Sequence, residues 1–222
     1  RLIIPMAEIS QRKMADVFII QDVLELLNID LTKVDRFIFS RHCDLNKEGH
    51  ERISELLQEH DIKVIIDLDD YWVLPSDNTA HAAYESLVDP NQGIRKSIER
   101  SILMADHMWT PSPIIAKMAR KVNPKITHTI VPNAINPGEG HWNMTKTFNS
   151  EKEVRFGYTG ANNHMGDLEL MGIDWTKHYT YTTTIGGYDK YLHANESVDA
   201  LPLYEYGKIY ENFNVSLAPL RS

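Results

Sequence analysis

The acidic sequence DLDD, residues 67–70, ends an apolar run, and its carboxylates are strong candidates for chemistry. Asp67 and Asp69 lie one residue apart and could share a divalent cation, because such ions prefer oxygen ligands. The same acids could instead cap the next turn and hold a loop by hydrogen bonds. Either way they follow a predicted strand, and ligands of α/β sheets collect at the carboxyl ends of strands.

A further candidate is the loop that follows the apolar segment RFGYTG, residues 155–160. Gly157 and Gly160 flank the predicted strand end, and the sequence ANNHMGDLEL could begin a helix. Backbone N–H groups at such a turn and helix start attract phosphate. We therefore predict a phosphate-binding loop here, and an ordinary turn in which glycine only relieves strain is the alternative.

Other side chains near predicted strand ends could contact a ligand. Four ring-bearing residues follow the acidic loop and could line a groove or pack in the core: Tyr71, Trp72, His81 and Tyr84. Arg41 and Asn133 each lie at the end of a predicted strand, so we expect them to face a cleft.

The composition narrows the class of protein. The chain has 222 residues, with 23 Lys and Arg against 31 Asp and Glu, for a net charge of −8. Without a basic run, this balance argues against nucleic acid as a partner. The only cysteine, Cys43, excludes a disulfide framework and a cysteine-based metal site, so a reducing, cytoplasmic compartment fits best. No apolar run approaches the roughly 20 residues of a membrane-spanning helix.

The elements that must position these residues alternate between strand and helix in the first half of the chain. Strands are predicted over residues 15–20, 35–41, 63–70, 107–112 and 127–133, and helices over residues 47–60, 93–106 and 114–122. Ser112 and Pro113 are typical of a helix start, and Asn123-Pro124 of its end. Such alternation predicts parallel strands with crossover helices.

Another unit is predicted to begin at about Glu153, after a polar linker. Strands are expected over residues 155–160, 180–188 and 215–220, and a helix over residues 204–214. We therefore predict an α/β chain of two Rossmann-like units, residues 1–145 and 146–222, and we expect the C-terminal unit to be incomplete. A cleft between two such units would be a favoured ligand site.

Several segments resemble, in this order, the group 1 retaining glycosyltransferases of the GT-B fold. They are VIIDLDDYW, SILMADHMWTPSPIIAKMA, TIVPNAINP, RFGYTGANNHMGDLELM and NFNVSLAPL. The resemblance runs from about Asp16 to Leu220 and is strongest to bacterial and phage-associated members with an acidic strand end. It implies an acceptor-side domain followed by a nucleotide-sugar-side domain. The paired glutamates of that family would lie after Ser222.

The resemblance implies retaining transfer of a sugar from a nucleotide-sugar to a glycan or lipid-linked acceptor. The nucleotide-sugar would be a co-substrate, and neither a metal nor another cofactor is expected. Peripheral association with the inner face of a membrane is left open, and no catalytic residue is identified. On the donor side, the diphosphate would meet Gly160, Ala161, Asn162, His164 and Arg221. On the acceptor side, the cleft would be lined by Arg41, Asp69, Asp70, Tyr71, His81 and Asn133.

Two alternatives stay open. The sequence IIDLDD also resembles the nucleophile motif of haloacid-dehalogenase-type phosphatases, in which the first aspartate is phosphorylated and the second is the acid and base. Tyr71 departs from that pattern, which has a Thr or Val there. The other alternative is a sugar- or nucleotide-binding domain without catalysis.

Overall fold

The computed structural model describes residues 3–43, 46–76, 81–86, 93–133, 154–160, 165–183, 188–199, 201–202 and 205–218. The chain divides into two compact units, Arg1–Asn133 and Ala134–Ser222. Each unit is α/β and contains one parallel sheet of four strands among its described residues. The boundary that we expected near residue 145 lies outside the described residues. Among the helices that are described, none has the length and apolar character needed to cross a membrane.

The sheet of the first unit keeps its strands in chain order, all parallel. Its strands are β1 (Arg36–Ser40), β2 (Lys63–Asp67), β3 (His107–Thr110) and β4 (Thr127–Ile130). All four carboxyl ends therefore meet one edge of the sheet, as predicted for the ligand side. Ser40 lies opposite Asp67, so the turn after β1 adjoins the acidic loop after β2.

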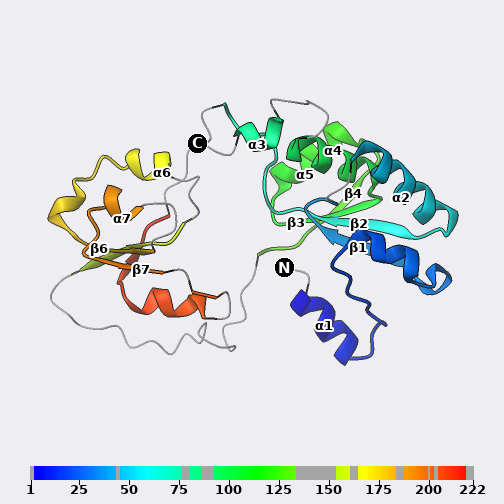
Figure 1. Cartoon of the computed structure of the whole chain (residues 1–222), viewed down its shortest axis with the longest axis horizontal. Helices are drawn as coiled ribbons and strands as arrows, with labels where there is room; N and C mark the ends of the chain where they lie inside the picture. The colour runs from blue at the N-terminus through cyan, green and yellow to red at the C-terminus, as the bar shows by residue number, and fades with distance from the viewer. Residues whose placement is uncertain are drawn as a thin grey trace. The chain divides into compact units, whose positions relative to one another are not determined.

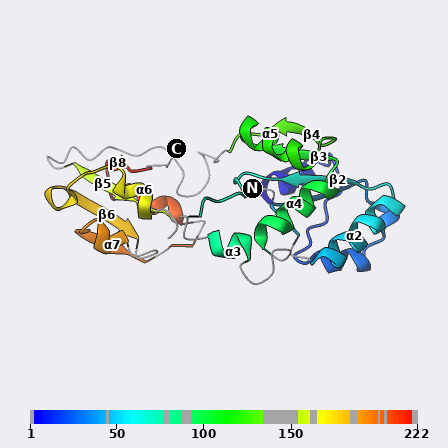
Figure 2. The same ribbon diagram turned by 90° about the horizontal axis from the view of Figure 1, so that it is seen from above.

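Helices cover this sheet. They are α1 (Ile3–Gln11), α2 (Lys47–Glu59), α3 (His81–Glu85), α4 (Ile94–Met104) and α5 (Pro113–Val122), with short 3₁₀ turns η1 (Val23–Asn28) and η2 (Leu31–Lys33). Figure 1 shows α2, α4 and α5 on one side of the strands and α1 on the other. Seen from above, α4 lies between α2 and α5 (Figure 2). The core beneath these three helices includes Ile66, Ile98, Met108 and Ala119.

The predicted start and end of α5 are confirmed. The Ser112 side chain accepts a hydrogen bond from the Ile114 amide (3.2 Å), and Pro113 occupies the first turn. The helix ends at Val122, and Asn123 caps it.

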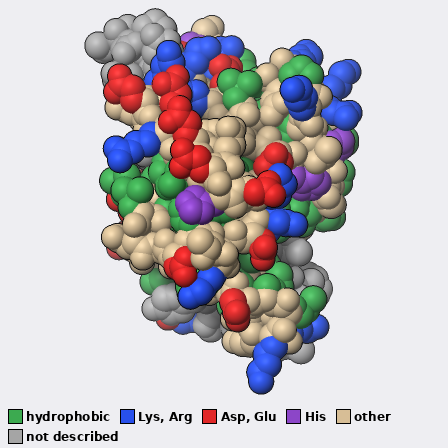
Figure 3. Space-filling model, turned by 90° about the vertical axis from the view of Figure 1, so that its right-hand side faces the viewer, with side chains coloured by type: hydrophobic (Ala, Val, Ile, Leu, Met, Phe, Trp, Pro, Cys, Tyr) green, Lys and Arg blue, Asp and Glu red, His purple; other side chains and the backbone are tan. Residues whose placement is uncertain are grey.

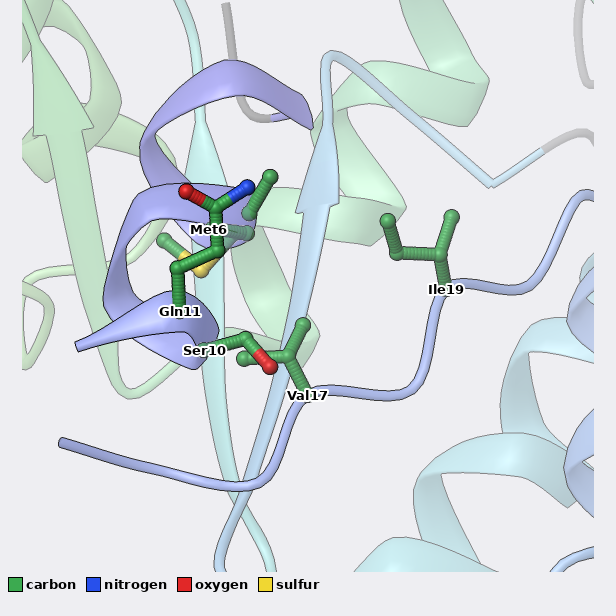
Figure 4. A pocket seen from close by; sticks show the side chains of 6 residues that line it. Met6, Ser10, Gln11, Val17 and Ile19 are labelled. Carbon is green, nitrogen blue, oxygen red and sulfur yellow. The ribbon is translucent and has the colours of Figure 1, made fainter. Parts of the chain in front are cut away.

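The strand predicted over residues 15–20 is wrong. This segment is irregular, because only Ile20 of its apolar residues packs against the core while Phe18 and Ile19 stay exposed. The segment instead passes alongside α1, and a cavity of about 310 Å³ lies between them (Figure 4). Its walls come from Met6, Ala7, Ser10, Gln11, Val17 and Ile19, so none of the predicted site residues lines it.

The sheet of the other unit has a different strand order, β7-β6-β5-β8, and again all pairs are parallel. Its strands are β5 (Arg155–Tyr158), β6 (Tyr179–Thr183), β7 (Glu196–Val198) and β8 (Val215–Ser216). After β5, strand β6 pairs with one edge of β5, and β7 then pairs with the outer edge of β6. The chain then returns to place β8 on the other side of β5.

Two separate apolar clusters cover the two faces of this sheet. One contains Tyr158, Leu168 and Leu192, contributed by β5, by α6 (Met165–Glu169) and by the end of α7 (Tyr188–Tyr191). The other contains Tyr181, Ile209 and Phe213, contributed by β6 and by the 3₁₀ helix η7 (Tyr206–Glu211) with the turn after it. Figure 1 shows η7, in red, on the opposite side of this sheet from α6 and α7. The unit is therefore covered on both faces, as in Rossmann-like folds.

Candidate functional site

The strand order of the C-terminal unit reverses between β5 and β8. In open α/β sheets, ligands bind in the crevice at such a switch point, outside the carboxyl ends of the two strands. Here those ends are followed by Thr159 and Gly160 on one side and by Leu217 and Ala218 on the other. The Leu217 amide donates to the Gly157 carbonyl (2.8 Å), so the two segments stay together past the end of β8.

The two glycines of this strand end are required by packing within the unit. A Cβ atom on Gly157 would collide with the Phe213 ring, and one on Gly160 would collide with the Tyr158 side chain. Both contacts support the alternative that these glycines serve the fold, and neither requires a ligand. Whether Gly160 also approaches a phosphate stays a prediction.

Hydroxyl groups surround the end of β5. Thr159 Oγ1 lies 3.2 Å from the Tyr210 hydroxyl, and Thr182 Oγ1 donates to the Tyr158 carbonyl (2.9 Å). Burial, together with the neighbouring Tyr188, raises the pKa of Tyr158 well above its ordinary value. Its hydroxyl therefore stays neutral. Tyr210 was not among the residues expected at this site, because it lies 51 residues from Thr159 in sequence and reaches it only through the folding of η7 against the sheet.

Four predicted donor-side residues lie outside the described residues: Ala161, Asn162, His164 and Arg221. Asp167 in α6 is buried and has an interaction partner. Gly160 is the one donor-side candidate that the structure describes.

In the first unit, the carboxyl ends of β1 and β2 bring Arg41 and Asp70 together. The Arg41 backbone is left-handed (φ 67°), and its amide donates to the Asp67 carbonyl (2.8 Å). Its guanidinium lies 3.7 Å from an Asp70 carboxylate oxygen, donates to the Tyr84 hydroxyl and stacks over the Tyr84 ring (5.6 Å to the centroid). The buried Nε of Arg41 has no hydrogen-bond partner among the described residues, so its donors are not all used.

The ring-bearing side chains after β2 divide between core and surface. Trp72 is 1% exposed and packs in the core, so it does not line a groove. Tyr84 is also buried. Tyr71 is exposed, with its ring centroid 5.5 Å from that of Trp72. His81 Nδ1 lies 2.9 Å from the Leu74 carbonyl, which must accept, so this bond ties α3 to the segment that follows the acidic loop.

Ion pairing holds α3, and with it Tyr84, in place. Arg95 on α4 donates to Glu85 (3.0 Å) and to Glu99 (3.0 Å), and these two carboxylates raise the pKa of Arg95. Gly93 is needed at the start of α4, because a Cβ there would meet the Tyr84 carbonyl.

Asn133 does not join the Arg41 group. It follows β4, at the opposite edge of the sheet from β1, and three strand spacings place these two strands roughly 14 Å apart. Asn133 is exposed and has an interaction partner. Within the described ranges, no group of three His, Cys, Asp or Glu side chains could hold a metal ion.

A buried polar network lies under the turn that carries Arg41, and its members were not expected from the sequence because they lie up to 58 residues apart. His50 Nδ1 lies 3.1 Å from the Asn46 carbonyl, which accepts, and His50 Nε2 lies 3.2 Å from the Ser101 hydroxyl. Ser101 Oγ in turn accepts from the Cys43 amide (3.3 Å), and Ser97 Oγ donates to the Cys43 carbonyl (2.9 Å). Burial raises the pKa of the Cys43 thiol to about 12. The thiol is therefore not a nucleophile, and Cys43 serves through its backbone.

No protein-family model matches the chain, and no curated protein matches it at a significant level.

Proposed function

We propose that the protein is a glycosyltransferase that moves a sugar from a nucleotide-sugar to a hydroxyl of an acceptor. The observation that carries this proposal is the strand order β7-β6-β5-β8, whose switch point lies at the end of β5. A diphosphate suits that place, because exposed backbone amides and hydroxyls at strand ends can bind its oxygens.

The donor side belongs to the C-terminal unit. The Thr159 and Gly160 amides and the chain after β8, at Ala218, would contact the diphosphate. Tyr158 and Tyr210 would hold this loop in shape through the contacts described above. His164 and Arg221 complete the proposal as donors to the sugar and the phosphate.

The acceptor side belongs to the first unit. Carboxylates accept hydrogen bonds from sugar hydroxyls, and Asp69 and Asp70 stand where a hydroxyl could reach them. Arg41 offers donors to the same ligand, and the exposed Tyr71 ring offers a flat apolar surface. This mixture of donors, acceptors and a ring favours a polyhydroxylated acceptor.

The transfer forms one bond and breaks one. The acceptor oxygen bonds to the anomeric carbon of the donor, and the bond from that carbon to the diphosphate breaks. The electron pair stays on the leaving phosphate oxygen, which also takes the proton of the acceptor hydroxyl. Fixed backbone dipoles and basic groups around the leaving phosphate would stabilise its growing charge.

The phosphatase alternative is less well supported. A phosphorylated aspartate must reach a phosphorus atom in line with the leaving group. Asp67 is 1% exposed and Leu68 is fully buried, so substrate has no access to that carboxylate.

The test is a transfer assay with the whole chain. A panel of nucleotide-sugars is incubated with oligosaccharide and lipid-linked acceptors, and nucleoside diphosphate release and product are measured together. We expect acceptor-dependent release, with the anomeric configuration retained. Release of inorganic phosphate from the panel, or no turnover with any donor, would overturn the proposal.

A further inference from the structure

Helix α5 and the segments beside it carry a basic surface, although the chain as a whole is acidic. From His107 to Asn133 the sequence has no Asp or Glu but has Lys117, Arg120, Lys121 and Lys125, in a chain of net charge −8. All four side chains are exposed, and none forms an ion pair within the part of the chain that the structure describes.

Three residues of α5 form one outward stripe. At about 100° per residue, Ile114, Lys117 and Lys121 point the same way, opposite the buried Ile115 and Ala119. Ile114 is 70% exposed although it is apolar. The stripe therefore combines cations with an apolar side chain at its amino-terminal end.

Another exposed apolar side chain lies near the other end of α5. Asn123 Nδ2 donates to the Ile102 carbonyl (3.0 Å) and the Ala105 carbonyl (3.2 Å), which joins the carboxyl-terminal ends of α4 and α5. Leu103, in that last turn of α4, is 59% exposed. Figure 3 shows Lys and Arg side chains gathered at the upper right of its face, with hydrophobic atoms among them.

We propose that this α5 surface, made of Ile114, Lys117, Arg120, Lys121, Lys125 and Leu103, docks on an anionic lipid bilayer. The partner is chosen because its negative charge complements the four cations of this surface. Clustered cations are attracted to anionic headgroups, and exposed apolar side chains beside them can enter the acyl boundary. Such docking is independent of glycosyl transfer.

The apolar residues favour a membrane over a nucleic acid. A phosphate backbone is bound by cations and polar donors, and it gives an exposed Ile or Leu nothing to enter. Single-stranded nucleic acids stack their bases on aromatic side chains, and the side chains exposed here are aliphatic.

The test measures binding of the whole chain to vesicles of phosphatidylcholine, alone or with about 30% phosphatidylglycerol. We expect binding only to the anionic vesicles, weakening as salt rises. Lys117→Gln with Lys121→Gln should weaken binding about 25-fold, because each cation near the surface contributes about fivefold. Ile114→Ser should weaken it about tenfold while the salt dependence persists.

The matched control is Lys33→Gln with Lys47→Gln, which removes the same charge from two other exposed lysines. This variant should bind vesicles within about twofold of the parent. The proposal is overturned if the parent ignores anionic vesicles, or if both double variants lose binding equally. A further pair of results would also overturn it: Ile114→Ser binds anionic vesicles like the parent, and the parent binds polyuridylate as tightly as it binds vesicles. Together these results would show a surface that binds any polyanion.

Discussion

The Tyr158 side chain fills the space that a Cβ atom on Gly160 would occupy. Tyr158 is buried, and its ring stands edge-on to Tyr188 with the centroids 4.7 Å apart, so it has little room to withdraw. Gly160 is therefore needed for packing whether or not a phosphate binds beside it. Any substitution at this position affects folding before it affects binding.

The first prediction concerns that contact. Gly160→Ala should lower the free energy of unfolding by about 1–3 kcal/mol without any ligand, because the added methyl group overpacks against Tyr158. The comparison is Gly172→Ala, where a Cβ has open space but the backbone is left-handed (φ 60°), and the cost should be about 1 kcal/mol. Urea unfolding measures both. A Gly160→Ala variant as stable as the parent would show that Tyr158 yields freely.

The second prediction concerns the buried network under Arg41. Ser101→Ala removes the partner of His50 Nε2 and of the Cys43 amide, and two buried polar groups should then cost about 1–3 kcal/mol of stability. Ser54→Ala on α2 is the control, since Ser54 accepts from the exposed Gln58 at the helix surface. It should change stability by less than about 0.5 kcal/mol. Equal effects of the two variants would contradict the role given to Ser101.

The third prediction separates the acceptor from the donor. Arg41→Gln should leave the affinity for a nucleoside diphosphate unchanged but lower transfer about tenfold or more, through loss of charged hydrogen bonds to the acceptor. Titration calorimetry and the transfer assay measure the two effects. Arg12→Gln removes the same charge from an exposed side chain just after α1 and should change neither. Loss of diphosphate binding in Arg41→Gln would move Arg41 to the donor side.

The fourth prediction concerns the buried Asp67. The whole chain should release no phosphate from a generic aryl phosphate, because substrate cannot reach this carboxylate. Release at a steady rate, abolished by Asp67→Asn but not by Asp70→Asn, would instead establish the phosphatase alternative.

Local signals predicted the regular elements of the first unit well. α5 illustrates this, because Ser112, Pro113 and Asn123 define its ends by short-range hydrogen bonding alone. The segment over residues 15–20 failed because an apolar run becomes a strand only where a neighbouring strand pairs with it. Burial also needs three dimensions, since Tyr71 and Trp72 are adjacent in sequence but only Trp72 enters the core.

The arrangement of the candidate sites was less predictable. The strand-end rule led us to expect Arg41 and the acidic loop at one cleft, and Arg41 lies 3.7 Å from Asp70 because β1 and β2 are neighbours. It could not show that Asn133 lies at the far edge, nor that β8 returns to the side of β5, because strand order depends on which face each crossover covers. The packing of Phe213 on Gly157 depends on that return.

The most direct test of the central claim is the binding of a nucleoside diphosphate at the switch point between β5 and β8. Titration calorimetry of UDP, GDP, ADP and TDP into the whole chain should detect at least one. Ala218→Asp, a carboxylate on an exposed residue just after β8, should weaken that ligand about tenfold or more by charge repulsion. Val154→Asp adds the same charge at an exposed site before β5, at the other end of the sheet, and should bind like the parent. Binding of none of the four, or equal affinities of the two variants, would contradict the claim.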